Sequence, residues 1–173
     1  MKQFLLLALV ATSAVYAQTN NTKMSAPSEN GKAQQQEKVQ SGQRPQSGTF
    51  KWYTNFDEAS MVASQSRRPM VLYFTGSDWC GWCKKMDQEV FASSEFQNAV
   101  GGKYIFVKLD FPMNSKLPES EMRQNAQLKQ RYGVTGYPTL VLIDSEGSFI
   151  GETGYRSGGG RSYAEWLDTF FGK

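Results

Sequence analysis

The chain has 173 residues, which fits one domain with accessory segments, and its hydrophobic content of 39% is low enough that some stretch should stay unpacked. Residues 49–173 contain 14 basic and 14 acidic side chains, and this neutral balance argues against a basic face that follows a phosphate backbone, so we expect no nucleic-acid partner. Histidine is absent, which excludes hydrolases of the Ser-His-Asp and Cys-His types as well as histidine-ligated zinc and haem sites.

Residues 1–17 have the pattern of a secretory signal peptide. Lys2 precedes a short apolar run at 4–11, and Val15 and Ala17 stand at the −3 and −1 positions of a cleavage site after Ala17. An uncleaved membrane anchor is the alternative, but the apolar run is much too short to span a bilayer. We therefore expect a cleaved signal peptide, a periplasmic protein and no stable insertion into the membrane.

Residues 18–48 are predicted to be a disordered polar linker. Gln, Ser, Asn, Lys and Gly dominate this stretch, so it cannot bury enough apolar surface to offset the entropy lost on ordering. A partner-binding arm is the alternative interpretation. Aromatic and branched residues become frequent from Phe50 onward, and a folded domain is expected over 49–173.

The pattern of the domain predicts alternating strands and helices. Asn55 with Glu58 three positions later forms a capping box at a helix start, and the apolar run Met70–Thr75 is typical of a strand covered on both faces. The order predicts an α/β layer sandwich with a mixed central sheet. In chain order we expect a strand at 50–53, a helix after residue 55, a strand at 70–75, a helix from the cysteines to residue 90, a helix at 94–100, a strand at 104–109, a helix at 119–132, a hairpin of 139–143 and 148–150, and a last helix after a glycine hinge at 158–160.

The only two cysteines, Cys80 and Cys83, follow the 70–75 strand directly and open a helix. Two cysteines at this spacing can close a disulfide without unwinding the helix. The unpaired N–H groups and the positive end of the helix dipole stabilise a thiolate at the first sulfur, which holds the pKa of Cys80 below that of a free thiol. We predict a redox pair in which Cys80 attacks a disulfide and Cys83 resolves the mixed disulfide.

Two alternatives compete with a redox pair. A purely structural disulfide would close a loop of four residues and contribute about 2 kcal/mol by the chain-entropy formula, less than a long-range bridge supplies. A zinc site needs about four ligands, and only carboxylates remain once histidine and further cysteines are missing. We therefore favour the redox pair and expect neither a metal nor a cofactor.

Two motifs resemble those of thioredoxins. Trp79-Cys80-Gly81-Trp82-Cys83-Lys84 is similar to the thioredoxin active-site turn, and residues 131–140, which include Tyr137-Pro138, resemble the segment that bears the cis-proline. Residues 74–80 are similar to exported bacterial thioredoxin-like proteins related to the Dsb reductases. The resemblance covers about 50–173 and implies a thioredoxin fold, a three-layer sandwich whose central mixed sheet is flanked by helices.

The resemblance also implies which residues contact the substrate. It implies that the Tyr137–Pro138 peptide bond is cis and faces the disulfide, and that the Tyr137 backbone pairs with an extended substrate chain. Packing is the alternative role for each aromatic side chain; we favour packing for Trp79 and surface contact for Trp82. The substrate-binding candidates are Trp79, Gly81, Trp82, Tyr137 and Pro138.

The sequence departs from the family where thioredoxins usually carry a buried aspartate, about six residues before the first cysteine. Tyr73 and Phe74 stand there instead, although Lys108 matches the lysine that usually neighbours this acid. Lys108 and Asp78 are candidates for tuning the cysteine pKa values, Asp78 being more typical of a solvated turn residue. Water is the expected route for the Cys83 proton. The stretch between Lys108 and Tyr132 is longer than in small thioredoxins. Two interpretations are open: the longer stretch alters the choice of partner, or it is a neutral insertion.

These observations predict an exported thiol–disulfide oxidoreductase that reduces protein disulfides in the periplasm. Gly81-Trp82 lacks the histidine of strongly oxidising relatives, which favours a reductase over an isomerase or an oxidase. The expected partners are exported proteins with disulfides and a membrane thiol donor of the Dsb type, and we expect a monomer. The alternatives are a peptide-binding or chaperone-like module that keeps the disulfide as a structural bridge, and a peroxidase using Cys80.

Overall fold

The computed structural model describes residues 48–172. The predicted signal peptide and all of the predicted linker except its last residue lie outside the described residues. Within the described part, none of the helices has the length and apolar character that crossing a bilayer requires.

Five strands form one mixed sheet in the order β1-β3-β2-β4-β5. β2 runs parallel to β3, which in turn pairs in parallel with β1, whereas β4 is antiparallel to both β2 and β5. β2 therefore lies at the centre of the sheet, and all six of its residues are buried, as its continuous apolar run predicts. The strand bounds are Trp52–Tyr53 for β1, Met70–Thr75 for β2, Ile105–Asp110 for β3, Thr139–Ile143 for β4 and Phe149–Thr153 for β5.

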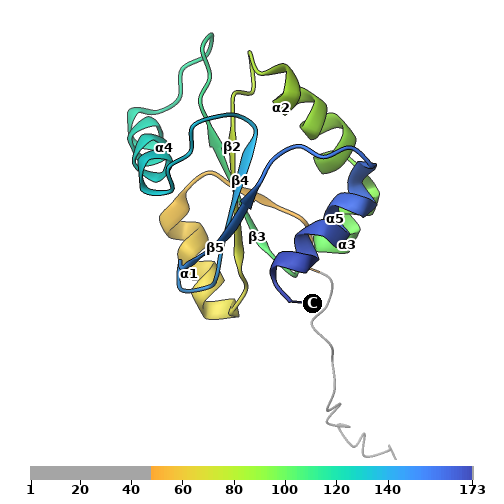
Figure 1. The fold of residues 1–173 in the computed structure, drawn as a ribbon. Helices are drawn as coiled ribbons and strands as arrows, with labels where there is room; N and C mark the ends of the chain where they lie inside the picture. The colour runs from red at the N-terminus through yellow and green to blue at the C-terminus, as the bar shows by residue number, and fades with distance from the viewer. Residues whose placement is uncertain (1–47, 173) are drawn as a thin grey trace, which may run out of the picture. The chain divides into compact units, whose positions relative to one another are not determined.

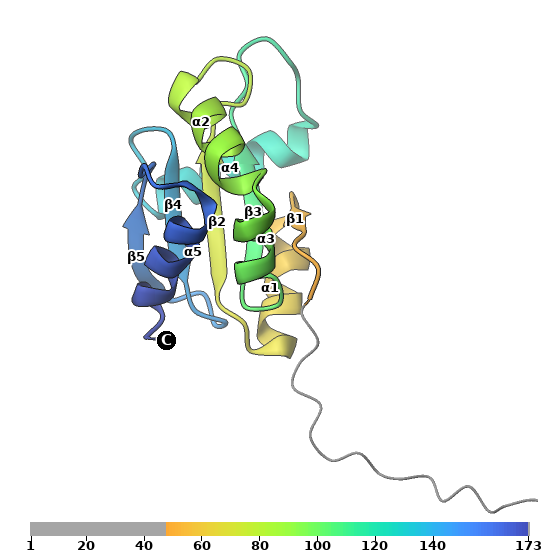
Figure 2. The ribbon, with the colours of Figure 1, turned by 90° about the vertical axis from the view of Figure 1, so that its right-hand side faces the viewer.

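Helices cover both faces of the sheet (Figures 1 and 2). One core cluster lies under α3, α5 and η1, and the other lies under α1 and α4. Since side chains alternate along a strand, Val71 and Tyr73 of β2 enter the first cluster and Leu72 and Phe74 enter the second. The helix bounds are Phe56–Ser66 for α1, Gly81–Met86 for α2, Asp87–Phe91 for η1, Ser94–Val100 for α3, Glu119–Arg131 for α4 and Gly159–Phe170 for α5.

The structure confirms the α/β layer sandwich and the mixed sheet. The last strand is longer than predicted, Phe149–Thr153 rather than 148–150, and the last helix begins at Gly159, within the predicted glycine hinge. Two further elements also differ. The strand predicted at 50–53 is paired only over Trp52–Tyr53, and the Phe50 side chain packs against the rings of Phe96 and Phe106. The helix predicted from the cysteines to residue 90 is two segments, α2 and the π-helical turn η1. The wider turn of η1 places Val90 and Phe91 in the core.

Candidate active site

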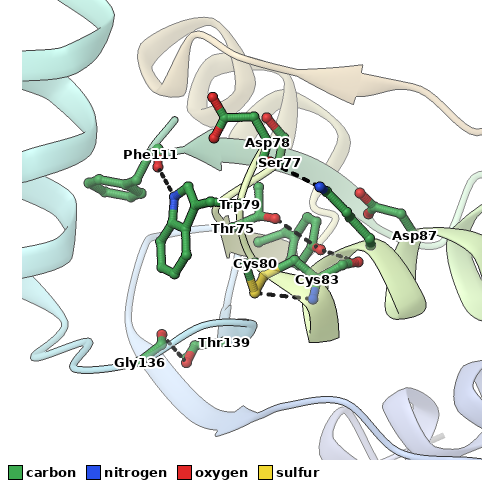
Figure 3. Close-up of a disulfide and its surroundings, with 12 residues drawn as sticks. Thr75, Ser77, Asp78, Trp79, Cys80, Cys83, Asp87, Phe111, Gly136 and Thr139 are labelled. Atoms are coloured by element: carbon green, nitrogen blue, oxygen red, sulfur yellow. Dashed lines mark hydrogen bonds between the residues drawn. A yellow bond between two sulfur atoms is a disulfide. The ribbon is translucent and has the colours of Figure 1, made fainter. Parts of the chain in front are cut away.

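Cys80 lies where β2 gives way to a helix. After Thr75 the chain turns, with the Cys80 N–H donating to the Gly76 carbonyl oxygen over 2.9 Å, and Cys80 becomes the N-cap of α2. Cys80 and Cys83 are joined in a disulfide with their Cα atoms 5.2 Å apart. The N–H of Cys83 donates to the Cys80 sulfur over 3.1 Å (Figure 3). The first sulfur therefore occupies the capping position that an anion favours at a helix start.

The two sulfurs differ in exposure. Cys80 retains 5% of its surface, whereas Cys83 is fully buried beneath the helix. Gly81 between them is exposed, and a Cβ placed there would contact nothing within 4 Å. Of the two cysteines, Cys80 is therefore the one that keeps some exposed surface, next to the open position of Gly81.

Trp79, just before Cys80, and Trp82, between the two cysteines, are both exposed, but their contacts differ. Trp79 lies edge-on to the Tyr137 ring at 5.7 Å, and its indole N–H donates to the Phe111 carbonyl oxygen over 2.8 Å. The indole presses so close to Gly76 that a Cβ there would approach the ring to 2.4 Å. Trp82 is 60% exposed and contacts Tyr155. Trp79 thus combines packing with partial exposure, whereas Trp82 presents most of its ring to solvent.

The turn before β4 lies beside the active-site turn. Its Tyr137–Pro138 peptide bond is cis. Thr139, the first residue of β4, is the register partner of Phe74 near the end of β2, and the Thr139 hydroxyl donates to the Gly136 carbonyl oxygen over 2.9 Å. This register, together with the contact between the Trp79 and Tyr137 rings, places the cis-proline turn next to the segment that leads into Cys80.

A half-buried carboxyl that the sequence analysis missed lies behind the disulfide. Asp87 follows Cys83 by four positions, which puts both on one side of the helix, and its carboxylate is 3.9 Å from the Lys108 ammonium. The Tyr73 hydroxyl accepts from Thr75 over 3.1 Å and donates to the Cys83 carbonyl oxygen over 3.4 Å.

The surroundings of Asp87 favour its neutral form. Burial raises the pKa of Asp87, and the nearby Lys108 charge and the hydrogen bond from Tyr73 offset only part of that effect. A raised pKa makes the ionised carboxylate a stronger base, and so a better proton acceptor, than an ordinary aspartate. The signal for Asp87 in the sequence is its spacing of four from Cys83, whereas the family pattern directs attention upstream to Tyr73 and Phe74.

Asp78, the other acid near the cysteines, is directed away from the sulfurs (Figure 3). Its carboxylate accepts hydrogen bonds from the backbone N–H groups of Met113, Asn114 and Ser115, and these bonds lower the pKa of Asp78. Lys108, its fellow candidate, pairs with Asp87 instead. The structure thus brings Lys108 into the surroundings of Cys83 through Asp87, and it ties Asp78 to the loop after β3.

Comparison with known proteins agrees with this geometry. The sequence profile described as a thioredoxin-like domain matches residues 56–170. The chain belongs to the thioredoxin-like family. This confirms the family and the fold that the two motifs predict.

Within the thioredoxin-like family, the similar relatives carry Dsb names. The disulfide bond reductase DsbH of Chlamydia pneumoniae is 40% identical over 120 residues, which cover 69% of this chain and 72% of that protein. The thiol:disulfide interchange protein DsbD of Photorhabdus laumondii subsp. laumondii is 26% identical over 101 residues, which cover 58% of this chain and 16% of DsbD. This chain is therefore a thioredoxin-like homologue of Dsb-system proteins and carries the cysteine pair of a thiol–disulfide oxidoreductase.

A solved structure of a DsbH oxidoreductase is similar to this chain. It has a TM-score of 0.67 and 37% sequence identity, and the match covers 76% of this chain and 91% of that one. The solution structure of a thioredoxin from Thermus thermophilus, with 19% identity and a TM-score of 0.50, shows the fold alone and covers 71% of this chain and 85% of that one.

Proposed function

We propose that this protein is an exported thiol–disulfide oxidoreductase that reduces protein disulfides. The observation that carries the proposal is the Cys83 N–H donating to the sulfur of Cys80 at the start of α2, where Cys80 keeps 5% of its surface and Cys83 keeps none. In the reduced protein the same N–H stabilises a thiolate at Cys80 and lowers its pKa. The kinship with DsbH, named as a disulfide bond reductase, supports the reducing direction.

The reaction begins at Cys80. Its thiolate attacks one sulfur of a substrate disulfide; the bond between Cys80 and that sulfur forms as the substrate S–S bond breaks, and the departing sulfur leaves as a thiolate that takes a proton. Cys83 then loses its proton and attacks the Cys80 sulfur, which breaks the bond to the substrate. The substrate leaves with two thiols and two more electrons, and the protein is left with the Cys80–Cys83 disulfide found in the structure.

Asp87 is the acceptor of the Cys83 proton in this proposal. It lies one helical turn after Cys83, and the neighbouring Tyr73 hydroxyl, which lowers the pKa of Asp87, donates to the Cys83 carbonyl oxygen over 3.4 Å. The Lys108 ammonium beside it compensates the negative charge that Asp87 carries when it is deprotonated. Asp87 thereby takes the part that a buried aspartate takes in thioredoxins at the position where this chain has Tyr73 or Phe74.

The surface around Cys80 contacts the substrate in this proposal. The exposed rings of Trp79 and Trp82 and the open position of Gly81 leave room for an extended chain, and the Tyr137–Pro138 turn supplies backbone groups on the other side. Aromatic side chains of this kind give a partner apolar contact area at low entropic cost.

A second turnover requires a dithiol donor to reduce the Cys80–Cys83 disulfide. A membrane thiol donor of the Dsb type fits, since DsbD is among the relatives of this chain. We propose that the protein is delivered to the periplasm by the signal peptide at 1–17, works there as a monomer and acts on exported proteins that contain disulfides.

Insulin reduction with dithiothreitol as the electron donor tests this function. Cys80→Ser should abolish the acceleration that the wild type gives. Cys83→Ser should accumulate a mixed disulfide with insulin, visible on a non-reducing gel. Equal rates for the wild type and Cys80→Ser would instead support a binding module with a structural disulfide, and a reduction potential above about −150 mV would reject the reducing direction.

A further inference from the structure

The loop between β3 and α4, residues 111–118, rises next to the start of α2 at one end of the sheet (Figures 1 and 2). It belongs to the stretch that is longer here than in small thioredoxins. The proposed reaction uses none of its side chains. The three residues before Cys80 hold this loop in place through hydrogen bonds.

Each of these three residues makes a hydrogen bond with the last residue of β3 or with the loop that follows it. The Ser77 N–H and hydroxyl donate to the two carboxylate oxygens of Asp110, over 2.9 and 2.5 Å. The Trp79 indole donates to the Phe111 carbonyl oxygen over 2.8 Å.

Asp78 makes the largest share of these contacts. One of its oxygens accepts from Met113 N–H at 2.9 Å, and the other accepts from Asn114 at 2.6 Å and Ser115 at 3.1 Å. One carboxylate thus satisfies three consecutive backbone donors that lie 35 to 37 positions away in the sequence. Hydrogen bonds to an ionised acceptor are stronger than neutral ones, so this carboxylate is the main fixation of the loop 111–118.

The surface beside this fixed loop is apolar and positively charged. The Phe111 and Tyr137 rings lie 5.3 Å apart, and the Lys129 ammonium lies over both, 5.5 Å from the first centroid and 4.9 Å from the second. None of the ion pairs within residues 48–172 includes Lys129. Met113, held through its backbone by Asp78, is 72% exposed. The Lys129 charge is therefore available to an acidic group that approaches the aromatic rings.

We propose that Asp78 is a positioning residue that holds the loop 111–118 as one wall of the substrate site, and that this wall receives an extended polypeptide with an acidic side chain near its cysteine. The inference deepens the proposed function by naming the class of substrate. Trp79 links the wall to the chemistry, because it contacts Tyr137 and Phe111 and directly precedes Cys80. A small disulfide reaches Cys80 without contacting the wall, whereas a polypeptide gains contact area and an ion pair from it.

Two cyclic peptides test the inference, each with one disulfide and identical except that aspartate or lysine flanks one cysteine. Bis(2-hydroxyethyl) disulfide serves as the small substrate. The variants are Asp78→Ala and Lys129→Gln, with Asp57→Ala as the matched control because Asp57 is an exposed aspartate outside these contacts. Activity is read as kcat/KM, and docking is read separately from tryptophan fluorescence with serine-substituted versions of the same peptides, which bind without redox chemistry.

The wild type should favour the acidic peptide over the basic one by about fivefold, as expected for a single exposed charge pair. Asp78→Ala should lower kcat/KM for the acidic peptide about tenfold more than for the small disulfide, because three backbone donors lose their acceptor and the wall loosens. Lys129→Gln should remove the preference between the peptides, and Asp57→Ala should behave as wild type. The serine peptides should follow the same ranking in affinity.

Each contrary result bears on a defined part of the proposal. An equal loss on all three disulfides in Asp78→Ala, or a changed Cys80 pKa, would show that Asp78 acts on the sulfur or on folding and would overturn the inference. Equal use of both peptides by the wild type would overturn the acidic partner. A wild type that binds the acidic serine peptide but reduces neither cyclic peptide would reject the proposed function while upholding the wall.

Discussion

At the scale of single residues, the site depends on where two acids lie relative to one disulfide. Asp78 precedes the cysteines and faces the loop 111–118, whereas Asp87 follows them and shares a half-buried region with Tyr73 and Lys108. The acid nearer in sequence to the first cysteine is thus the one tied to the loop, and the acid beyond the second cysteine lies on the side of the helix that Cys83 occupies.

Asp87→Asn should slow the closure of the Cys80–Cys83 disulfide, because the Cys83 proton loses its acceptor. We expect turnover with insulin at pH 7 to fall about a hundredfold, at the lower end of what one positioned general base contributes. The loss should shrink as the pH rises, since hydroxide then takes the proton, and Asp87→Glu should recover part of the rate. Stopped-flow measurement of mixed-disulfide resolution between pH 6 and 9 checks this. A parallel pH profile for Asp87→Asn and wild type would contradict the assignment.

The same residue gives a stability prediction with a defined sign. Burial raises the pKa of Asp87 in the folded state, so between the unfolded and folded pKa values the folded protein holds more protons than the unfolded chain. Stability must then fall as the pH rises through that window. Asp87→Asn, which cannot ionise, should gain stability relative to the wild type between pH 3 and pH 7. Urea unfolding at these two pH values, with the exposed Asp57→Asn as control, measures the difference. A relative loss in Asp87→Asn would show that its pairing with Lys108 outweighs its burial.

At the scale of secondary structure, α3 and α5 pack closely enough to hold the back of the site in place. Gly160 in the first turn of α5 is buried, and a Cβ there would lie 1.8 Å from the Ser93 hydroxyl oxygen and 2.9 Å from the Phe96 Cβ. Ser93 also caps α3 by accepting from the Phe96 N–H. The two helices therefore approach through a glycine and a helix cap.

Gly160→Ala should destabilise the protein by about 1–3 kcal/mol, the usual cost of overpacking a tight contact. Gly81→Ala is the matched control, because a Cβ at Gly81 meets nothing within 4 Å and its stability should stay within about 0.5 kcal/mol of the wild type. Chemical denaturation of both variants with the disulfide intact provides the comparison. Equal stabilities for the two variants would mean that α5 can shift away from α3 at little cost.

At the scale of the whole molecule, the features predicted from the sequence are those encoded locally. The buried strand Met70–Thr75 and the helix start at Cys80 follow from contiguous residues, and both stand where the pattern puts them. Asp87 was missed because its raised pKa comes from burial in the folded protein, and because its ion-pair partner Lys108 lies on β3, 21 positions later. The hydrogen bonds from residues 113–115 to Asp78 were missed because they join residues more than 30 positions apart in the sequence. The π-helical turn depends on packing Val90 and Phe91 into the core, and the local sequence pattern does not predict such a turn.

The account depends most directly on the charge state of Cys80 in the reduced protein. The rate of iodoacetamide alkylation of Cys83→Ser, followed from pH 4 to pH 10, reports the pKa of the first sulfur. Because a backbone N–H and the helix start face this sulfur, the rate should reach half its maximum well below the value near 8.5 of a free thiol. A titration that coincides with that of free cysteine would contradict the proposal that Cys80 attacks as a stabilised thiolate.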